Sequence, residues 1–126
     1  MWHKLASMKA PVPKPVIWLG DSLTRLQTFP SPVQDEMGYA LYLAQVGGKH
    51  VSAKPLKGFG SGVLEVVSDH RGDTFRAVYT VRLQHRVYVL HAFQKKSRKG
   101  IATPQSDIDV LKQRLARAAA LDAALE

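Results

Sequence analysis

The sequence contains no cysteine, and acidic residues are scarce: 10 Asp and Glu stand against 18 Lys and Arg in 126 residues. Without cysteine, disulfide frameworks, thiolate zinc sites and cysteine nucleophiles are all excluded. Long hydrophobic runs are also missing. The longest run near the N-terminus is residues 16–19, whereas a membrane-spanning helix needs about 20 apolar residues. We therefore expect a cytoplasmic protein that does not associate with membranes.

The first 14 residues carry positive charges but neither a hydrophobic stretch nor a cleavage signature, so we do not expect a secretory signal. Their prolines oppose a helix, and we expect residues 1–14 to form a flexible N-terminal arm. Residues 15–126 have the length of a single domain, since domains cluster at roughly 100–150 residues. An apolar content of 45% is that of a folded chain.

The formal net charge of +8 is concentrated in one part of the chain. Residues 54–100 carry ten basic and three acidic side chains, a net charge of +7, whereas residues 1–53 carry +2 and residues 101–126 carry −1. Because phosphate neutralisation supplies most non-specific affinity for nucleic acids, this distribution indicates a polyanion-binding face. The alternative is a basic surface that only keeps the protein soluble.

The apolar pattern predicts an α+β fold in which helices pack a small, antiparallel-rich sheet, in the order β-α-α-β-β-β-α. We expect strands at residues 15–19, 63–68, 74–83 and 86–93, and helices at residues 21–27, from Ser31 to Gly47, and after Pro104. Ser31 and Gln34 have the spacing of a capping box, and the three later strands are close enough in sequence for an antiparallel meander.

Strict alternation along the strands predicts which side chains share a face. In the strand at 74–83, Arg76 lies on the more polar face and Tyr79 packs on the opposite one. In the strand at 86–93, His91 falls on the same face as Val87 and Val89.

Several motifs resemble known functional sites but lack the features that those sites require. Gly58, Gly60 and Gly62 resemble a phosphate loop, but they precede a strand instead of opening a helix, so we expect only a bend. Ser61 among them lacks the order of a nucleophile elbow. The five histidines show no paired metal spacing, and carboxylates do not cluster with them. We therefore expect no metal site and no cofactor.

The side chains that remain as functional candidates are Lys, Arg, His and Tyr, on or beside a small sheet. This set suits RNA cleavage without a metal, because the ribose 2′-hydroxyl is an internal nucleophile. The protein then has only to position it, move two protons and stabilise the phosphorane. Arginine suits the last task, since its planar guanidinium binds phosphate oxygens bidentately and stays protonated. Residue types alone do not separate an RNA-cleaving surface from an RNA-binding one.

The stretches 75–81 and 87–97 together resemble the RelE/ParE toxin superfamily, specifically the phage-derived HigB-like branch of type II toxin–antitoxin toxins. Residues 54–65 and the segment from Thr103 to Ile108 are similar to the same branch, and the resemblance spans residues 16–117. It implies a RelE-like α+β fold and an endoribonuclease that cleaves mRNA in the ribosomal A site and arrests translation. It also implies a cognate antitoxin with a helix-turn-helix DNA-binding domain, so that DNA is contacted only through that partner.

The resemblance implies roles for individual residues. The arginine of the family's Arg-x-x-Tyr strand falls on Arg76, which would contact the scissile phosphate and stabilise the transition state. The basic residue after the last strand falls on Lys95 or Lys96, as a phosphate contact or proton donor. Lys57 matches the family's upstream basic residues and is a catalytic candidate, for proton transfer or for positioning the RNA. His91 is a further candidate for proton transfer, as histidines are in HigB enzymes. Further RNA contacts are expected from Lys54, Arg71, Lys95, Arg98 and Lys99.

Two departures leave the general base unassigned. The catalytic tyrosine that some RelE enzymes carry after the last strand is absent from residues 97–103, and their strand lysines are replaced around Glu65 and Val67. Each site residue also has a structural alternative. Arg76 would then be a strand arginine paired to Asp69 or Glu65, and His91 a hydrogen-bonded core residue.

Two other functions stay open on the same fold. One is a ParE-like poison of DNA gyrase, and the other is a non-catalytic RNA-binding remnant.

Overall fold

The computed structural model describes residues 12–95 and 103–125. Its elements, in chain order, are β1 (Val16–Trp18), α2 (Ser22–Leu26), α3 (Ser31–Gln45), β2 (Ala53–Pro55), β3 (Val63–His70), β4 (Asp73–Thr80), β5 (Val87–Lys95) and α4 (Gln105–Ala123). The predicted α+β class is thereby confirmed.

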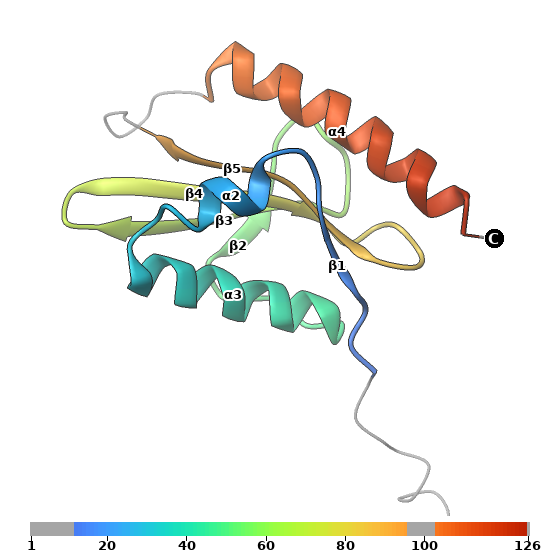
Figure 1. Cartoon of the computed structure of the whole chain (residues 1–126), viewed down its shortest axis with the longest axis horizontal. Helices are drawn as coiled ribbons and strands as arrows, with labels where there is room; N and C mark the ends of the chain where they lie inside the picture. Colours follow the sequence, from blue (N-terminus) through green and yellow to red (C-terminus); the bar gives the residue numbers. More distant parts are fainter. Residues whose placement is uncertain (1–11, 96–102, 126) are drawn as a thin grey trace, which may run out of the picture.

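One five-stranded sheet organises the molecule, with the strand order β1-β5-β4-β3-β2 (Figure 1). β3, β4 and β5 form the predicted antiparallel meander, and β1 adds in parallel to β5. The predicted order lacks β2, a three-residue strand that pairs with β3. A strand this short shows too little alternation to be recognised from sequence.

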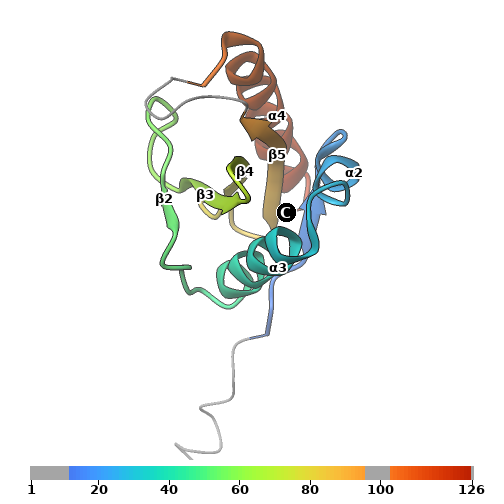
Figure 2. The same ribbon diagram turned by 90° about the vertical axis from the view of Figure 1, so that its left-hand side faces the viewer.

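The sheet is covered on both faces, by α3 on one side and α4 on the other (Figures 1 and 2). Met37 of α3 packs in a cluster that includes Tyr79 of β4. Leu111 of α4 packs in a second cluster that includes Val78 of the same strand. The predicted packing role of Tyr79 is confirmed, since its side chain is fully buried.

A β-bulge interrupts the pairing of β4 with β5. Val78 pairs with His91 while Tyr79 pairs with Val89, which leaves Leu90 as the extra residue. Leu90 packs in the α4-side cluster, and His91 bonds to Asp107 of α4. The predicted grouping of His91 with Val89 is therefore wrong, because one inserted residue reverses the alternation beyond it.

The predicted capping box of α3 is also wrong. Pro30 is the N-cap, and no side chain caps the helix. Because the helix begins one residue earlier than expected, Gln34 reaches the preceding turn, where its Nε2 donates to the carbonyl oxygens of Gln27 (3.1 Å) and Phe29 (2.8 Å). These bonds join the end of α2 to the first turn of α3.

Residues 1–11 of the expected arm lie outside the described residues, and the division into an arm and a domain stays a prediction. Lys14, the last residue of that arm, is joined to α3: its backbone N–H donates to the carbonyl of Gln45 (3.0 Å), whose Nε2 donates back to the carbonyl of Lys14 (2.6 Å). No helix within residues 12–95 and 103–125 combines the length and apolar character needed to cross a membrane.

Candidate anion-binding site

A cleft of about 400 Å³ opens on the α4 side of the sheet. Four of the predicted basic site residues line it: Lys54, Lys57, Arg76 and Lys95. The other lining residues are Pro55, Leu56, Phe59, Glu65, Thr103, Ile108 and Leu111. Positive groups therefore meet a largely apolar wall, which α4 and the segment after β2 supply.

Strand register brings the charged residues together. Lys54 of β2 pairs with Glu65 of β3, and Glu65 in turn pairs with Val78 of β4. Arg76 lies two residues before Val78, on the same face, where it is a diagonal neighbour of Glu65. Lys95 ends β5. Residues separated by 41 positions in sequence thus reach one cleft because four consecutive strands lie side by side.

The loop that carries Lys57 and Phe59 is shaped by glycine. Gly58 and Gly60 have φ angles of +87° and +78°, a region that residues with a Cβ rarely adopt. The prediction that these glycines form a bend is confirmed. The bend lets the loop turn directly from β2 into β3, so that Lys57 and Phe59 lie at the rim of the cleft.

Glu65 forms the centre of an ion-pair cluster. Its Oε2 accepts a hydrogen bond from Nη1 of Arg76 at 2.7 Å, and its Oε1 lies 3.7 Å from Nζ of Lys54. The side chains of Glu65 and Arg76 are only 6% and 15% exposed. Of the two partners that the sequence offered for Arg76, Glu65 is therefore the one observed, and Asp69 instead accepts from the hydroxyl of Thr74.

Arg76 keeps unused hydrogen-bonding capacity despite this pair. Its Nε is buried and has no hydrogen-bond partner in the described part of the chain. Leaving a buried donor unsatisfied costs about 1–3 kcal/mol. The guanidinium is therefore fixed by one strong contact without being saturated by it.

Lys95 is coupled to the same cluster. Burial lowers the pKa of its ammonium, and the positive charges of Arg76 and Lys54 lower it further, while Glu65 raises it. The cleft thus combines the Arg76 guanidinium with a lysine whose pKa is lowered.

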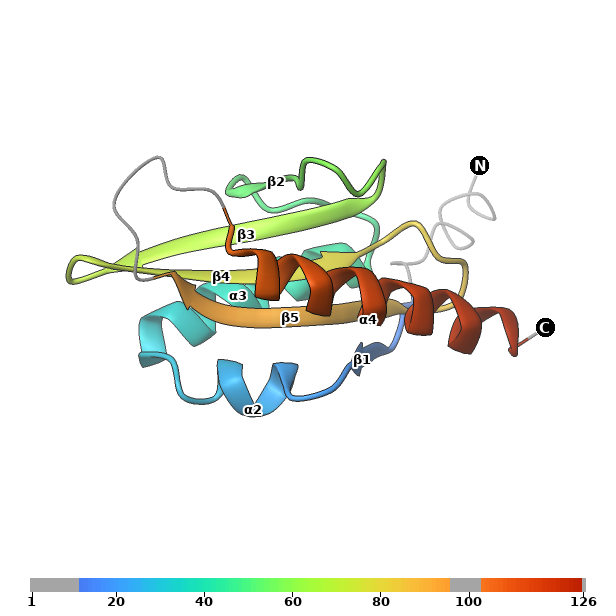
Figure 3. The same cartoon turned by 90° about the horizontal axis from the view of Figure 1, so that it is seen from above.

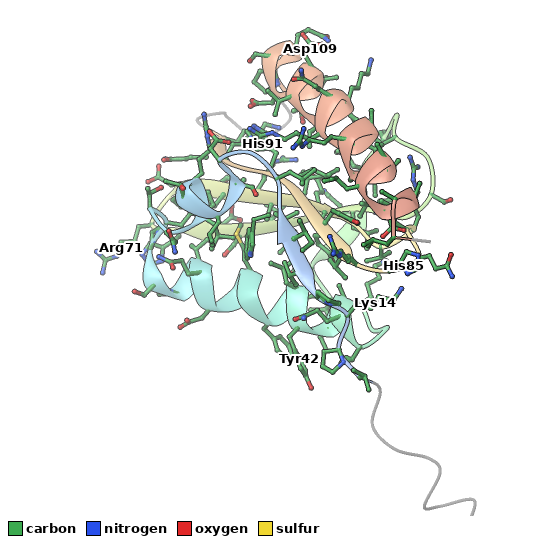
Figure 4. All side chains as sticks on the ribbon, turned by 45° about the vertical axis from the view of Figure 1, so that its right-hand side comes forward. Lys14, Tyr42, Arg71, His85, His91 and Asp109 are labelled. Carbon is green, nitrogen blue, oxygen red and sulfur yellow. The ribbon has the colours of Figure 1, made fainter. Side chains whose placement is uncertain are left out.

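His91 lies on the α4 side of the sheet (Figure 4) but is not among the residues that line the cleft. Its Nε2 is 2.8 Å from Oδ1 of Asp107 and its Nδ1 is 3.4 Å from Nη1 of Arg114. The ring stacks on Phe93, and the side chain is 3% exposed. Burial lowers the pKa of His91, against the opposing effect of Asp107. His91 therefore has the surroundings of a hydrogen-bonded core residue, which is the structural alternative to proton transfer.

The other predicted RNA contacts are not brought to the cleft by the described structure. Arg71 is exposed in the turn between β3 and β4, with a φ of 50°, and it does not line the cleft (Figure 4). Lys96, Arg98 and Lys99 lie outside the described residues. Within residues 12–95 and 103–125, no three His, Asp or Glu side chains gather closely enough to hold a metal ion.

Sequence reasoning missed a polar network that fixes α4. Arg114 donates through Nη2 to Oδ1 of Asp21 (2.7 Å) and through Nη1 to the carbonyl of Leu90 (2.9 Å). Asp21 also accepts from Arg25 at 2.8 Å, and its arginine partners lower its pKa to about 2. Gly20 leaves room for the Arg114 guanidinium, which a Cβ at that position would meet. Asp21 and Arg114 are 93 residues apart, and no local pattern links them.

A family model matches residues 24–116, a range that contains every residue lining the cleft. Its description is "Phage derived protein Gp49-like" (DUF891). No curated protein and no solved structure matches the chain. Since the match covers well over half of the sequence, the chain belongs to the phage-derived Gp49-like family, a toxin-like family related to RelE.

Proposed function

We propose that this protein is the toxin of a type II toxin–antitoxin module, of the HigB-like kind, and that it cleaves mRNA on the ribosome without a metal ion. The observation that carries the proposal is the convergence of Lys54, Lys57, Arg76 and Lys95 on one cleft. Family membership adds independent support for a toxin. The partner we propose is an antitoxin with a helix-turn-helix DNA-binding domain.

The proposed reaction is an internal transfer at phosphorus. The ribose 2′-oxygen forms a bond to the adjacent phosphorus and loses its proton to a base. The bond to the 5′-oxygen breaks, and that oxygen takes a proton, which leaves a 2′,3′-cyclic phosphate and a 5′-hydroxyl. Arg76 stabilises the extra negative charge of the phosphorane, because its guanidinium stays protonated and is aimed by its neighbours. Lys95 protonates the leaving oxygen, and Lys54 and Lys57 hold the flanking phosphates.

A non-catalytic RNA-binding module is the second candidate, and one observation favours it. The contact between Arg76 and Glu65 neutralises the cation on which transition-state stabilisation depends. In a binding module this pair would persist, and the lysines would supply the affinity for RNA.

Expression in a bacterium, with translation and mRNA 5′ ends followed over time, separates the candidates. For the nuclease we expect rapid translational arrest with new mRNA ends, and a loss of cleavage of about 10²–10³-fold in Arg76→Ala. Arg117→Ala is the matched control, since Arg117 is an exposed arginine of α4 outside the cleft. DNA damage signalling without mRNA cuts would indicate a gyrase poison. RNA binding without growth arrest would indicate the binding module.

A further inference from the structure

The cleft already contains an anion of its own. The Glu65 carboxylate lies between Arg76, at 2.7 Å, and Lys54, at 3.7 Å. Glu65 is 6% exposed on its side chain and is the third residue of β3, where pairing with β2 on one side and β4 on the other fixes the backbone. Its place on the guanidinium is therefore built into the sheet and is not a chance contact of a mobile surface side chain.

We propose that Glu65 is an internal competitor for phosphate: it occupies Arg76 in the free protein and must give up that contact before a phosphodiester can bind there. The proposal rests on the proposed function, in which the cleft binds RNA. Glu65 then lowers the affinity of the cleft for a phosphate that makes no other contacts.

The geometry of the guanidinium supports this competition. A phosphate is bound most strongly by two parallel N–H groups of one arginine, and Nη1 of Arg76 already donates to Glu65. A phosphate and a carboxylate on the same guanidinium would be two like charges in a partly buried cleft, where water screens them poorly. The two anions therefore exclude each other from full contact with Arg76.

The remaining cations decide how the competition ends. Lys54 is 62% exposed on its side chain and so has room to follow either anion. Lys57 and Lys95 line the same cleft. Because the cleft has four cations and one carboxylate, it still attracts a polyanion after Glu65 has released Arg76. Free RNA should bind weakly, whereas RNA held in place by the ribosome has a high effective concentration and displaces Glu65 more readily.

Binding measurements on the full-length protein test the proposal. The probes are inorganic phosphate and a 2′-fluoro RNA trinucleotide, which cannot attack its own phosphate. Because both ligands must displace the same contact, Glu65→Gln should tighten both by a similar factor, at least about tenfold. Glu65→Asp keeps the charge but shortens the side chain, and should give an intermediate gain. Asp69→Asn, which removes a carboxylate from the same strand outside the cleft, should change either affinity less than about twofold.

The proposal is overturned if Glu65→Gln tightens binding no more than Asp69→Asn does. Arg76→Ala separates that failure from failure of the proposed function. If Arg76→Ala weakens binding while Glu65→Gln has no effect, only the competition is wrong. If neither changes binding, the cleft does not bind phosphate and both proposals fall. Thermal unfolding of each variant shows whether it is folded, and glutamine keeps an amide oxygen that can still accept from Arg76.

Discussion

Asp122 should be one of the most sensitive positions for the stability of the fold. It lies in the last turn of α4 with 5% of its surface exposed. Its carboxylate accepts from the backbone N–H groups of Gln84 (2.9 Å) and His85 (3.2 Å) and from the hydroxyl of Tyr88 (3.0 Å). The side chain thus ties the end of α4 to the loop between β4 and β5.

The cost of Asp122→Ala follows from these contacts. Tyr88 is fully buried, so its hydroxyl loses its acceptor without gaining water. Each hydrogen bond to a charged group contributes about 1.5–3 kcal/mol, and the losses are not fully additive, so we expect a total of about 3–5 kcal/mol. For a chain of 126 residues that corresponds to a fall in Tm of about 11–19 °C.

The assay is thermal and urea unfolding of Asp122→Ala beside Asp109→Ala. Asp109 is exposed on the same helix and accepts from Gln105 in a pair four residues apart, so its loss should cost about 0.5 kcal/mol. Adding Tyr88→Phe to Asp122→Ala should recover part of the stability, because no buried hydroxyl is then left unpaired. Equal costs at the two aspartates would refute the reasoning.

Three further predictions concern charge and backbone. Glu65→Gln should lower the pKa of Lys95 further, because Glu65 raises it; an NMR titration of the lysine Cε resonances would show this, and an unchanged pKa would contradict it. Burial lowers the pKa of His91 below the ordinary 6.5, so the stability that depends on neutral His91 should be complete above about pH 6.5 and decline as the pH falls toward the folded-state pKa. Between pH 7.5 and 5.5, Tm should therefore fall less in His91→Gln than in wild type. An equal fall in Tm in the two proteins would contradict this. Gly62→Ala should cost about 1–3 kcal/mol in urea unfolding, since Gly62 has a φ of +81° and a Cβ there would meet Arg82; the open position Gly38 is the control.

Acid should remove the stability that Asp122 contributes to the fold. Burial raises the pKa of Asp122, but the hydrogen bonds from Tyr88, His85 and Gln84 outweigh burial, and the net pKa is lowered. The stability it contributes is therefore complete above the unfolded-state value near 3.8 and is lost as the pH falls through the folded-state pKa.

Local patterns in the sequence identified most of the fold and the basic residues of the cleft, but not its apolar wall. The alternation in β4 separated Arg76 from Tyr79 correctly, because side-chain direction in an unbroken strand depends only on the sequence itself. It failed at His91, because a bulge is a property of two paired strands and one strand does not encode it. Glu65 was foreseen as a partner of Arg76 but not as part of the cleft. The register of β3 against β4 places it beside Arg76, and its contact with Lys54 depends on β2, the strand that was too short to detect.

The position of the cleft wall depends on contacts that lie outside the cleft. Ile108 and Leu111 of α4 form part of the wall, and α4 lies along the sheet above β4 and β5 (Figure 3). Near its N-terminal end the helix is held by Asp107 on His91, in its middle by Arg114 on Asp21, and at its C-terminal end by Asp122. Because α4 is anchored on both sides of the wall residues, the apolar wall keeps a fixed distance from the cations of the sheet. His91 therefore contributes to the cleft by positioning α4, whether or not it ever transfers a proton.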